Sequence, residues 1–411
     1  MKLLDHPPEL LSLIVARLEP SDICNIRLTC HALDDFTFDI FSALFEEILL
    51  LPTKENFTRL RQLSRHARLA SSVTYVRIVT SLCMSSENDG AERIVPRGEL
   101  PFMAPSTEYE RCANEYASLV NQKDYIKSAL VLALYKLKRR IVVSVYERTP
   151  EYLTTARPWG WRALHKRVNQ NPSPQLSYTA KAGWDYHQPN VHTMICSESL
   201  EACGFAGVAS VSVESVQQDY LEAIQRPLQQ MGRLYIDLRN LCITTSDRKL
   251  HVSQRTIKPG LHLSNFLSSL PNLLSLHLDL SSDDNNDGYH HRVSNQIFKN
   301  VKFTNLETLL MRAIRMEPEV LMLFISNSKA SLTDLFLWRV SFPRTSRPSS
   351  WLSILKHLRA HFALECVDIR MMITALEEYE PKVDDIKNTK SGKTMVMEAL
   401  DRCIQKLEDQ Q

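Results

Sequence analysis

One acidic stretch of the sequence has the residue types and the spacing with which a calcium-binding loop begins. Asp283, Asn285, Asp287 and Gly288 could supply oxygen ligands and the tight turn that such a loop requires. The twelfth position holds Ser294, whereas a calcium loop needs a bidentate Glu there. We therefore expect a solvated polar turn and no metal site.

Two further motifs could bind a phosphate group or a metal ion, and neither is complete. Ser-Gly-Lys-Thr at 391–394 is like the end of a phosphate-binding loop, but Lys387 replaces the first glycine and no strand-like segment precedes it. His290 and His291 are adjacent, so their side chains diverge, and no third ligand is evident nearby. The sequence contains neither Gly-x-Ser-x-Gly nor His-Glu-x-x-His. We therefore predict that the protein is not an enzyme and uses no cofactor and no metal.

Charge and hydropathy argue against nucleic acid and membrane as partners. The net charge is only +2, and no stretch of 18 apolar residues exists. Basic residues at 61, 65 and 68 and at 138–140 could touch phosphates, but no aromatic side chain is interleaved for base stacking. Asp5, His6 and Glu9 interrupt the early apolar residues, so we expect no signal peptide. The nine scattered cysteines fit reduced thiols in the cytoplasm or the nucleus.

The N-terminal 33 residues predict two short apolar helices. Leu10, Ile14 and Leu18 are spaced one turn apart, and Leu11 and Val15 form a second stripe beside them. A proline at position 20 is expected to stop the first helix, and a serine at 21 to cap the second. Two helices of this length cannot bury so much apolar surface against each other. Part of this surface therefore needs a partner.

This segment resembles an F-box. The sequence His-Pro-Pro-Glu-Leu at 6–10 matches the start of the family pattern, with His6 in place of the leading leucine. The later positions of the pattern are matched in order by Leu18, Asp22, Ile23, Arg27 and Cys30. The resemblance implies that the chain binds the Skp adaptor and, through it, a cullin-RING ubiquitin ligase. The residues that it assigns to the adaptor surface are Pro7, Glu9, Leu10, Ile14, Leu18, Ile23 and Ile26.

Beyond residue 40 the sequence repeats a loose pattern, apolar-x-x-apolar-x-apolar, with helix-like segments between its occurrences. The pattern starts at residues 45, 73, 208, 231, 273, 306, 332 and 364. The spacing of the last four starts matches or slightly exceeds that of leucine-rich repeats. We therefore predict an α/β fold in which N-terminal F-box helices are followed by an irregular leucine-rich-repeat-like solenoid of alternating strands and helices. The segment after the F-box also resembles filamentous-fungal F-box proteins.

Strand alternation predicts which side chains face away from the core of this solenoid. Leu234, Ile236 and Leu238 are expected to point inward, so their neighbours point outward. The same count places residues 275, 277 and 279, then 308, 310 and 312, then 334, 336 and 338, then 366, 368 and 370 outside. This aromatic and charged surface has the composition of interface hot spots. It predicts that an unknown protein substrate binds Tyr235, Arg239, His277, Arg312, Phe336, Trp338 and Arg370. The alternative is that a neighbouring loop, such as 148–195, covers Phe336 and Trp338.

The chain is divided by these patterns into an F-box at 1–40, a repeat domain at 41–376 and a C-terminal part at 377–411. Loops or insertions are expected near 84–107 and 148–195, and a tight polar loop at 282–292. The C-terminal part is expected to be a charged linker followed by an amphipathic helix at 393–409.

The function predicted by the resemblance is that of a substrate-recognition subunit of an SCF-type ubiquitin ligase. A different class of function remains open, namely a non-catalytic repeat scaffold for protein–protein interaction without ligase activity. A third possibility is a hydrolase in an irregular α/β domain, which would require a cysteine or serine beside a histidine in one cleft.

Overall fold

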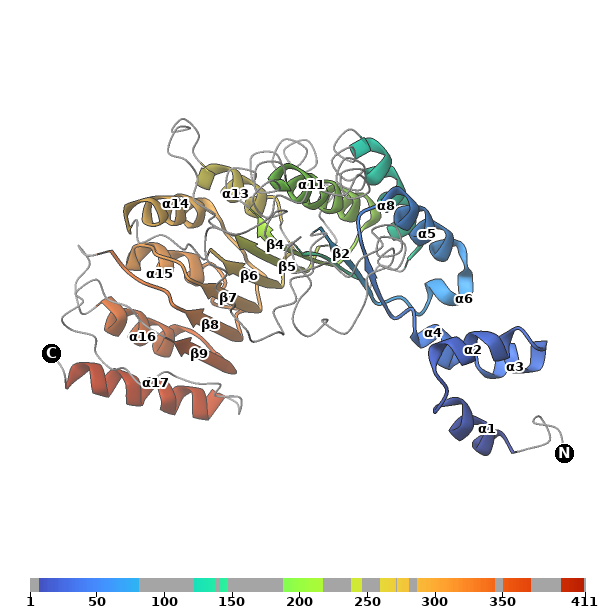
Figure 1. Ribbon diagram of the computed structural model, residues 1–411. Coiled ribbons are helices and arrows are strands. Elements are labelled where there is room, and N and C mark those ends of the chain that lie inside the picture. The colour runs from blue at the N-terminus through green and yellow to red at the C-terminus, as the bar shows by residue number, and fades with distance from the viewer. Residues whose placement is uncertain are drawn as a thin grey trace, which may run out of the picture.

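Short helices at the N-terminus lead into one long parallel sheet in the computed structural model of the chain (Figure 1). The structure describes residues 7–80, 122–137, 141–146, 188–216, 238–245, 259–270, 272–280, 287–343, 350–370 and 393–409. Among these residues, no helix is long and apolar enough to cross a lipid bilayer. The expected insertion near 84–107 lies outside the described residues.

Four helices form the N-terminal part: α1 (Pro8–Val15), α2 (Pro20–Arg27), α3 (His31–Phe36) and α4 (Phe38–Ala43). The prediction that Ser21 caps the second helix is wrong. Glu19 is the N-cap residue, and Pro20 occupies the first helical turn, where its missing N–H costs nothing. Because α1 ends at Val15, Leu18 lies in the connection between the two helices rather than on the helical stripe.

Nine strands pair in parallel and in the order of the sequence. They are β1 (Glu47–Leu50), β2 (Tyr75–Val79), β3 (Val142–Tyr146), β4 (Ser210–Val216), β5 (Asn240–Thr245), β6 (Ser275–Asp279), β7 (Thr308–Arg312), β8 (Asp334–Trp338) and β9 (Cys366–Arg370). Parallel neighbours require a crossover between each pair of strands, and helices supply most of these crossovers. The result is the solenoid-like alternation of strands and helices that the sequence predicts.

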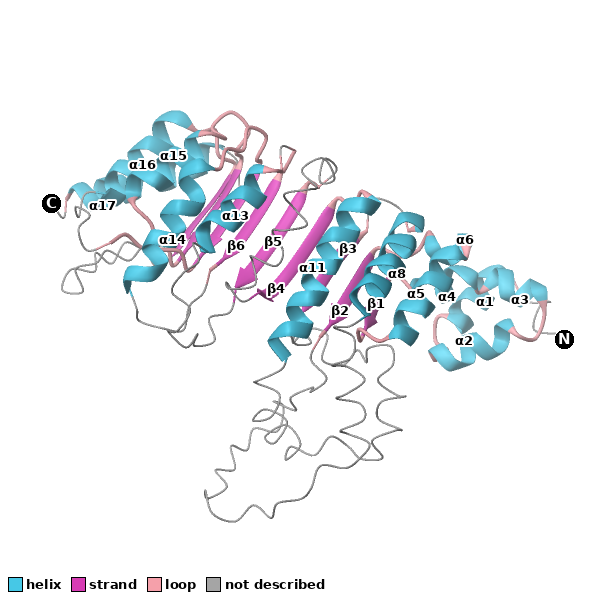
Figure 2. Cartoon of the chain, turned by 90° about the horizontal axis from the view of Figure 1, so that it is seen from above, coloured by secondary structure: helices cyan, strands magenta, loops and turns pink. Residues whose placement is uncertain are grey.

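The helices after the N-terminal part lie together on one face of the sheet (Figure 2). They are α5 (Lys54–Arg65), α6 (Ala67–Ala70), α8 (Lys123–Lys136), α11 (Gln188–Ala206), α13 (Pro259–Ser268), α14 (Asp287–Asn300), α15 (Pro318–Ser326) and α16 (Ser350–His361). A last helix, α17 (Lys393–Glu408), packs beside α16 at the C-terminal end, where Arg359 pairs with Asp401 at 2.7 Å. The N-terminal helices lie at the opposite end of the sheet (Figure 1).

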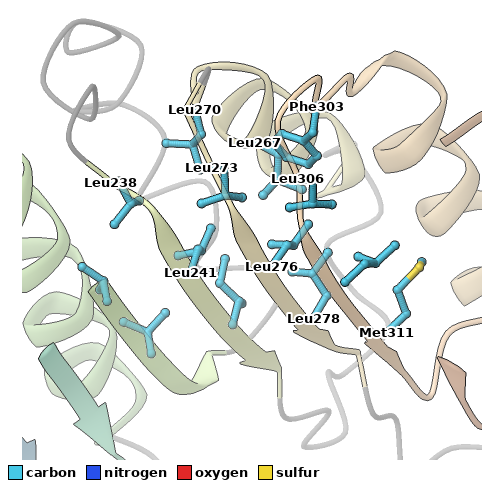
Figure 3. Packing of buried hydrophobic residues seen from close by; sticks show 14 of the residues in the cluster. Leu238, Leu241, Leu267, Leu270, Leu273, Leu276, Leu278, Phe303, Leu306 and Met311 are labelled. Carbon is cyan, nitrogen blue, oxygen red and sulfur yellow. The ribbon is translucent and has the colours of Figure 1, made fainter. Parts of the chain in front are cut away.

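The hydrophobic core lies between the sheet and these helices, and the repeated pattern builds it. Leu273, Leu276 and Leu278 are buried (Figure 3). The same three positions are filled by buried side chains in each of the next three repeats. Strand register stacks these positions, since Leu276 pairs with Leu309, and Leu309 with Leu335. A fully buried leucine contributes roughly 2 kcal/mol, so the stacked rungs hold neighbouring repeats together.

The repeated pattern does not account for every strand of the sheet. The strand β5 at Asn240–Thr245 was not predicted, although Leu238, Leu241 and Ile243 satisfy the same pattern and are buried. Residues 231–237 lie outside the described part of the chain. The strand β3 begins at none of the eight starts of the pattern, yet it pairs directly with β2 and β4.

Two segments expected to be loops contain helix. Within the insertion predicted at 148–195, residues from 188 onward belong to α11, and within the loop predicted at 282–292, residues from 287 onward belong to α14. Asp287 therefore opens a helix rather than completing a calcium loop. At the other end of α11, Gly207 adopts a φ of 70°, a conformation that glycine provides without steric cost and that ends many helices.

Two residues other than glycine also adopt a left-handed backbone, at equivalent positions of neighbouring repeats. Ala313, with φ of 53°, directly follows β7, and Arg339, with φ of 55°, directly follows β8. The Ala313 N–H donates to the Trp338 carbonyl, and the Arg339 N–H donates to the Arg370 carbonyl, both at 2.9 Å. These bonds extend the parallel ladder by one residue and hold the strained turn in place.

Candidate functional site

The first helix presents an apolar stripe to solvent. Leu10, Leu13 and Ile14 are 48%, 62% and 44% exposed, whereas Leu11 and Val15 are buried. Residues four apart lie on the same side of a helix, which places Leu10 beside Ile14 and Leu11 beside Val15. The helix therefore uses one stripe for its own packing and leaves the other uncovered.

The rest of the expected adaptor surface divides between exposed and buried positions. Pro7 and Glu9 are exposed, and Leu18 and Ile26 are half-buried. Ile23 is buried inside the chain, so it supports the surface from behind rather than facing a partner. Leu11, Val15, Leu33 and Phe38 in this part are buried as well, and none of these residues belongs to the continuous core of the sheet.

Two arginines hold the N-terminal helices in place. Arg27, which the F-box pattern includes, pairs with Asp34 at 2.5 Å and lies 3.8 Å from the Phe41 ring centroid. Arg68 of α6 pairs with Asp35 at 3.1 Å and lies 3.7 Å from the Phe38 ring centroid. Cation–π contacts of this kind contribute about 1 kcal/mol each and fix α3 and α4 against the start of the sheet domain. The contacts of Arg68 also differ from the free, phosphate-facing side chain that a nucleic-acid site needs.

Large apolar side chains that remain exposed gather in this N-terminal part. Within the described residues, five of eleven such side chains fall between positions 10 and 44: Leu10, Leu13, Ile14, Leu28 and Leu44. Leu28, which is 86% exposed, was not among the residues singled out from the sequence, although its place next to the matched Arg27 was a usable signal. An uncovered apolar patch on a helical module indicates a protein-interaction site.

The N-terminal part is therefore a helical module with buried side chains of its own and an apolar stripe turned outward. The family model of the F-box domain matches residues 3–33, so the chain carries an F-box domain. No curated protein matches the chain.

A second candidate surface is the face of the sheet that the helices leave open. Strand register forms one continuous row of side chains across its middle, through Leu49, Arg77, Ser144, Ser212, Cys242, His277, Leu310, Phe336 and Asp368. At the N-terminal end this face is buried at Leu49, Val79 and Ser144. The residues of this row on β6, β7 and β8, namely His277, Leu310 and Phe336, are half-buried, so a partner could contact this part of the face.

The carboxyl ends of β6 to β9 form a row of charged and aromatic side chains. Asp279, Arg312, Trp338 and Arg370 are direct neighbours in register. Arg312 lies 3.5 Å from Asp279, and the Arg370 guanidinium lies 5.0 Å from the Trp338 ring centroid. Arg370 also donates two hydrogen bonds to Asp368, at 2.7 and 2.5 Å.

Not every residue that alternation places outside is exposed. Asp279, Cys366 and Asp368 are buried, and the expectation that they face solvent is wrong. Asp368 is covered because Arg370, two residues later on the same face, reaches back over it as an ion pair.

Of the predicted substrate-binding residues, the structure brings His277, Arg312, Phe336, Trp338 and Arg370 together on one face. Arg239 precedes β5 and donates to the Asn272 carbonyl at 3.3 Å, and Tyr235 lies outside the described residues.

Two cysteines lie beside histidines, which is the arrangement that a thiol hydrolase needs. Cys196 Sγ is 3.5 Å from His192 Nε2, but both side chains are buried and come from one turn of α11. Cys242 Sγ is 3.3 Å from His277 Nδ1 on the open face. Burial lowers the pKa of His277, so this imidazole is mainly neutral at pH 7 and can share a hydrogen bond with the thiol. Across the described part of the chain, no three histidine, cysteine or acidic side chains are grouped as metal ligands.

Proposed function

We propose that the protein is a substrate-recognition subunit of an SCF-type cullin-RING ubiquitin ligase. The observation that carries this proposal is the outward stripe of Leu10, Leu13 and Ile14 on a module that matches the F-box domain. An aliphatic surface of this kind is stabilised when a partner removes it from water. The partner in the proposal is the Skp adaptor, which links the chain to the cullin and its RING subunit in the cytoplasm or the nucleus.

The sheet domain would supply the other half of this function. In the proposal it is a leucine-rich-repeat-type domain that binds a target protein at the open face between β6 and β9. Ubiquitin transfer then requires no nucleophile from this chain, because holding a target lysine near a charged conjugating enzyme raises its effective concentration.

Co-purification with the Skp adaptor tests the proposal. The double variant Leu10→Ala with Ile14→Ala truncates two half-exposed side chains of the stripe. Each truncation is expected to cost about 1 kcal/mol of binding free energy from lost apolar contact area, or roughly 2 kcal/mol if it leaves a cavity in the interface. We expect adaptor affinity to fall by at least about 30-fold, which corresponds to roughly 2 kcal/mol.

The matched control removes two similarly exposed apolar side chains elsewhere. Leu323 of α15 is 49% exposed and Met395 of α17 is 48% exposed, and both lie outside the F-box. Leu323→Ala with Met395→Ala is expected to leave adaptor binding unchanged. Equal co-purification of both double variants with the wild-type chain would defeat the proposal.

A further inference from the structure

The carboxyl ends of β7 and β8 each carry an exposed arginine. The Arg312 side chain is 48% exposed and its ion pair with Asp279 is a loose one, at 3.5 Å. Arg339 is exposed and forms no ion pair within the described residues. These two arginines flank Trp338, since Arg312 is its neighbour in register and Arg339 follows it in sequence.

Acidic side chains of the same region lie beneath this surface. The side chain of Asp368 is 1% exposed, and that of Asp279 is also largely covered. Arg312 and Arg370 thus pair with largely covered aspartates while Arg339 adds an exposed positive charge, so the outermost charges among the described residues of this edge are positive. Charges arranged in this way attract an anionic partner and steer its approach.

Aromatic side chains complete the surface. The Phe336 and Trp338 rings meet edge to face at 6.4 Å, and both are half-buried. Arginine, tryptophan and phenylalanine side chains that are held in place by their neighbours lose little conformational entropy on binding, and such residues dominate interface energies.

We propose that this Arg312–Trp338–Arg339 surface binds an acidic, extended segment of a target protein through its carboxylates. The two arginines lie on neighbouring strands, which are about 4.8 Å apart, and their long side chains can reach carboxylates on alternate residues of an extended chain, roughly 7 Å apart. Single carboxylates fit better than a phosphate, because the two aspartates below repel a double negative charge more strongly. This inference rests on the proposed function, since it names the class of target that the subunit recognises.

Binding of a labelled peptide to the full chain tests the inference without the adaptor. The probe is a fluorescein-labelled twelve-residue peptide in which Glu alternates with Leu and Ser, and the reference is the same peptide with Gln for Glu. Fluorescence anisotropy is expected to show at least tenfold tighter binding of the Glu peptide, and this preference is expected to shrink as salt is raised.

Variants locate the site. Arg312→Gln and Arg339→Asn are each expected to weaken binding of the Glu peptide about five- to tenfold, and Asn is chosen at 339 because it tolerates the left-handed backbone. The control Arg402→Gln, an exposed arginine on α17, is expected to have no effect. These variants are also expected to co-purify with the Skp adaptor as the wild-type chain does, which separates failure of this inference from failure of the proposed function.

Several results would overturn the inference. Equal binding of the Gln peptide, or an equal loss in Arg402→Gln, would remove the role of these carboxylate contacts. Tighter binding of a phosphoserine peptide would replace carboxylate by phosphate. Tighter binding of a single-stranded oligonucleotide, lost in the same two variants, would assign the surface to nucleic acid.

Discussion

Glu198 of α11 is a carboxylate whose burial has a measurable consequence for stability. Glu198 is 8% exposed, and its Oε2 atom has no hydrogen-bond partner within the described structure. Nearby Glu201 is paired with Lys127 at 2.8 Å. Burial first, and the negative charge of Glu201 second, raise the pKa of Glu198 to about 7. The perturbation that isolates this effect is Glu198→Gln, which keeps the shape and removes the charge.

The sign and size of the effect follow from the pKa. Because the folded state raises this pKa above its unfolded value, the folded state binds the proton more tightly. The associated stability is fully present below about pH 4.5 and is lost as the pH rises through about 7. A shift of this size corresponds to about 3 kcal/mol at most. Partial solvent access reduces our expectation to about 1–2 kcal/mol.

Urea unfolding at pH 5, 6, 7 and 8 measures this difference. Glu198→Gln is expected to be about 1–2 kcal/mol more stable than the wild-type chain at pH 8, and the gain is expected to vanish toward pH 5. The control Glu398→Gln, at an exposed carboxylate on α17, is expected to follow the wild-type chain at every pH. A variant that is no more stable than the wild-type chain at pH 8, or a gain that does not change with pH, would refute the reasoning.

Two further predictions concern stability. Leu11→Ala is expected to destabilise the F-box helices by about 2–3 kcal/mol, whereas Leu13→Ala is expected to change their stability by less than about 0.5 kcal/mol, because only the first side chain is buried. Amide hydrogen exchange in α1 and α2 checks this, and equal effects would contradict the assigned helix faces. Ala313→Gly is expected to be neutral or to stabilise the chain by up to about 1 kcal/mol, since it relieves a positive φ. Ala360→Gly in α16 is expected to cost about 0.5–1 kcal/mol in thermal unfolding, and a larger loss at position 313 than at 360 would contradict the role of the backbone angle.

The sequence predicts the fold well where the repeated pattern coincides with a clear two-residue alternation of apolar side chains in a strand. Leu276, Leu309 and Leu335 lie on the predicted side of their strands because every second side chain must point into the core. The pattern did not predict β5, because the segments that start at 231 and at 238 both satisfy it and the local sequence does not choose between them. It also failed at the start of α11, where prolines and polar residues suggested a loop but the helix is held by tertiary packing rather than by a clear apolar stripe.

The candidate site could be predicted in part for a similar reason. Helical spacing grouped Leu10 with Ile14 correctly, and the structure leaves both exposed. Ile23 could not be assigned to the inside from spacing alone, because its burial depends on how α2 meets α1 and α3 in space. The covering of Asp368 by Arg370 likewise depends on three-dimensional reach between side chains, which strand alternation does not describe.

The claim on which the account depends is that α1 docks into a foreign protein through Leu10 and Ile14. Amide hydrogen exchange of the full chain, measured with and without a saturating amount of purified Skp adaptor, tests it most directly. The account predicts added protection in Pro8–Val15 and in the neighbouring Pro20–Arg27, with no change in α15 or α16 at the far end of the sheet. Unchanged exchange throughout the F-box, with the adaptor present in excess, would contradict it.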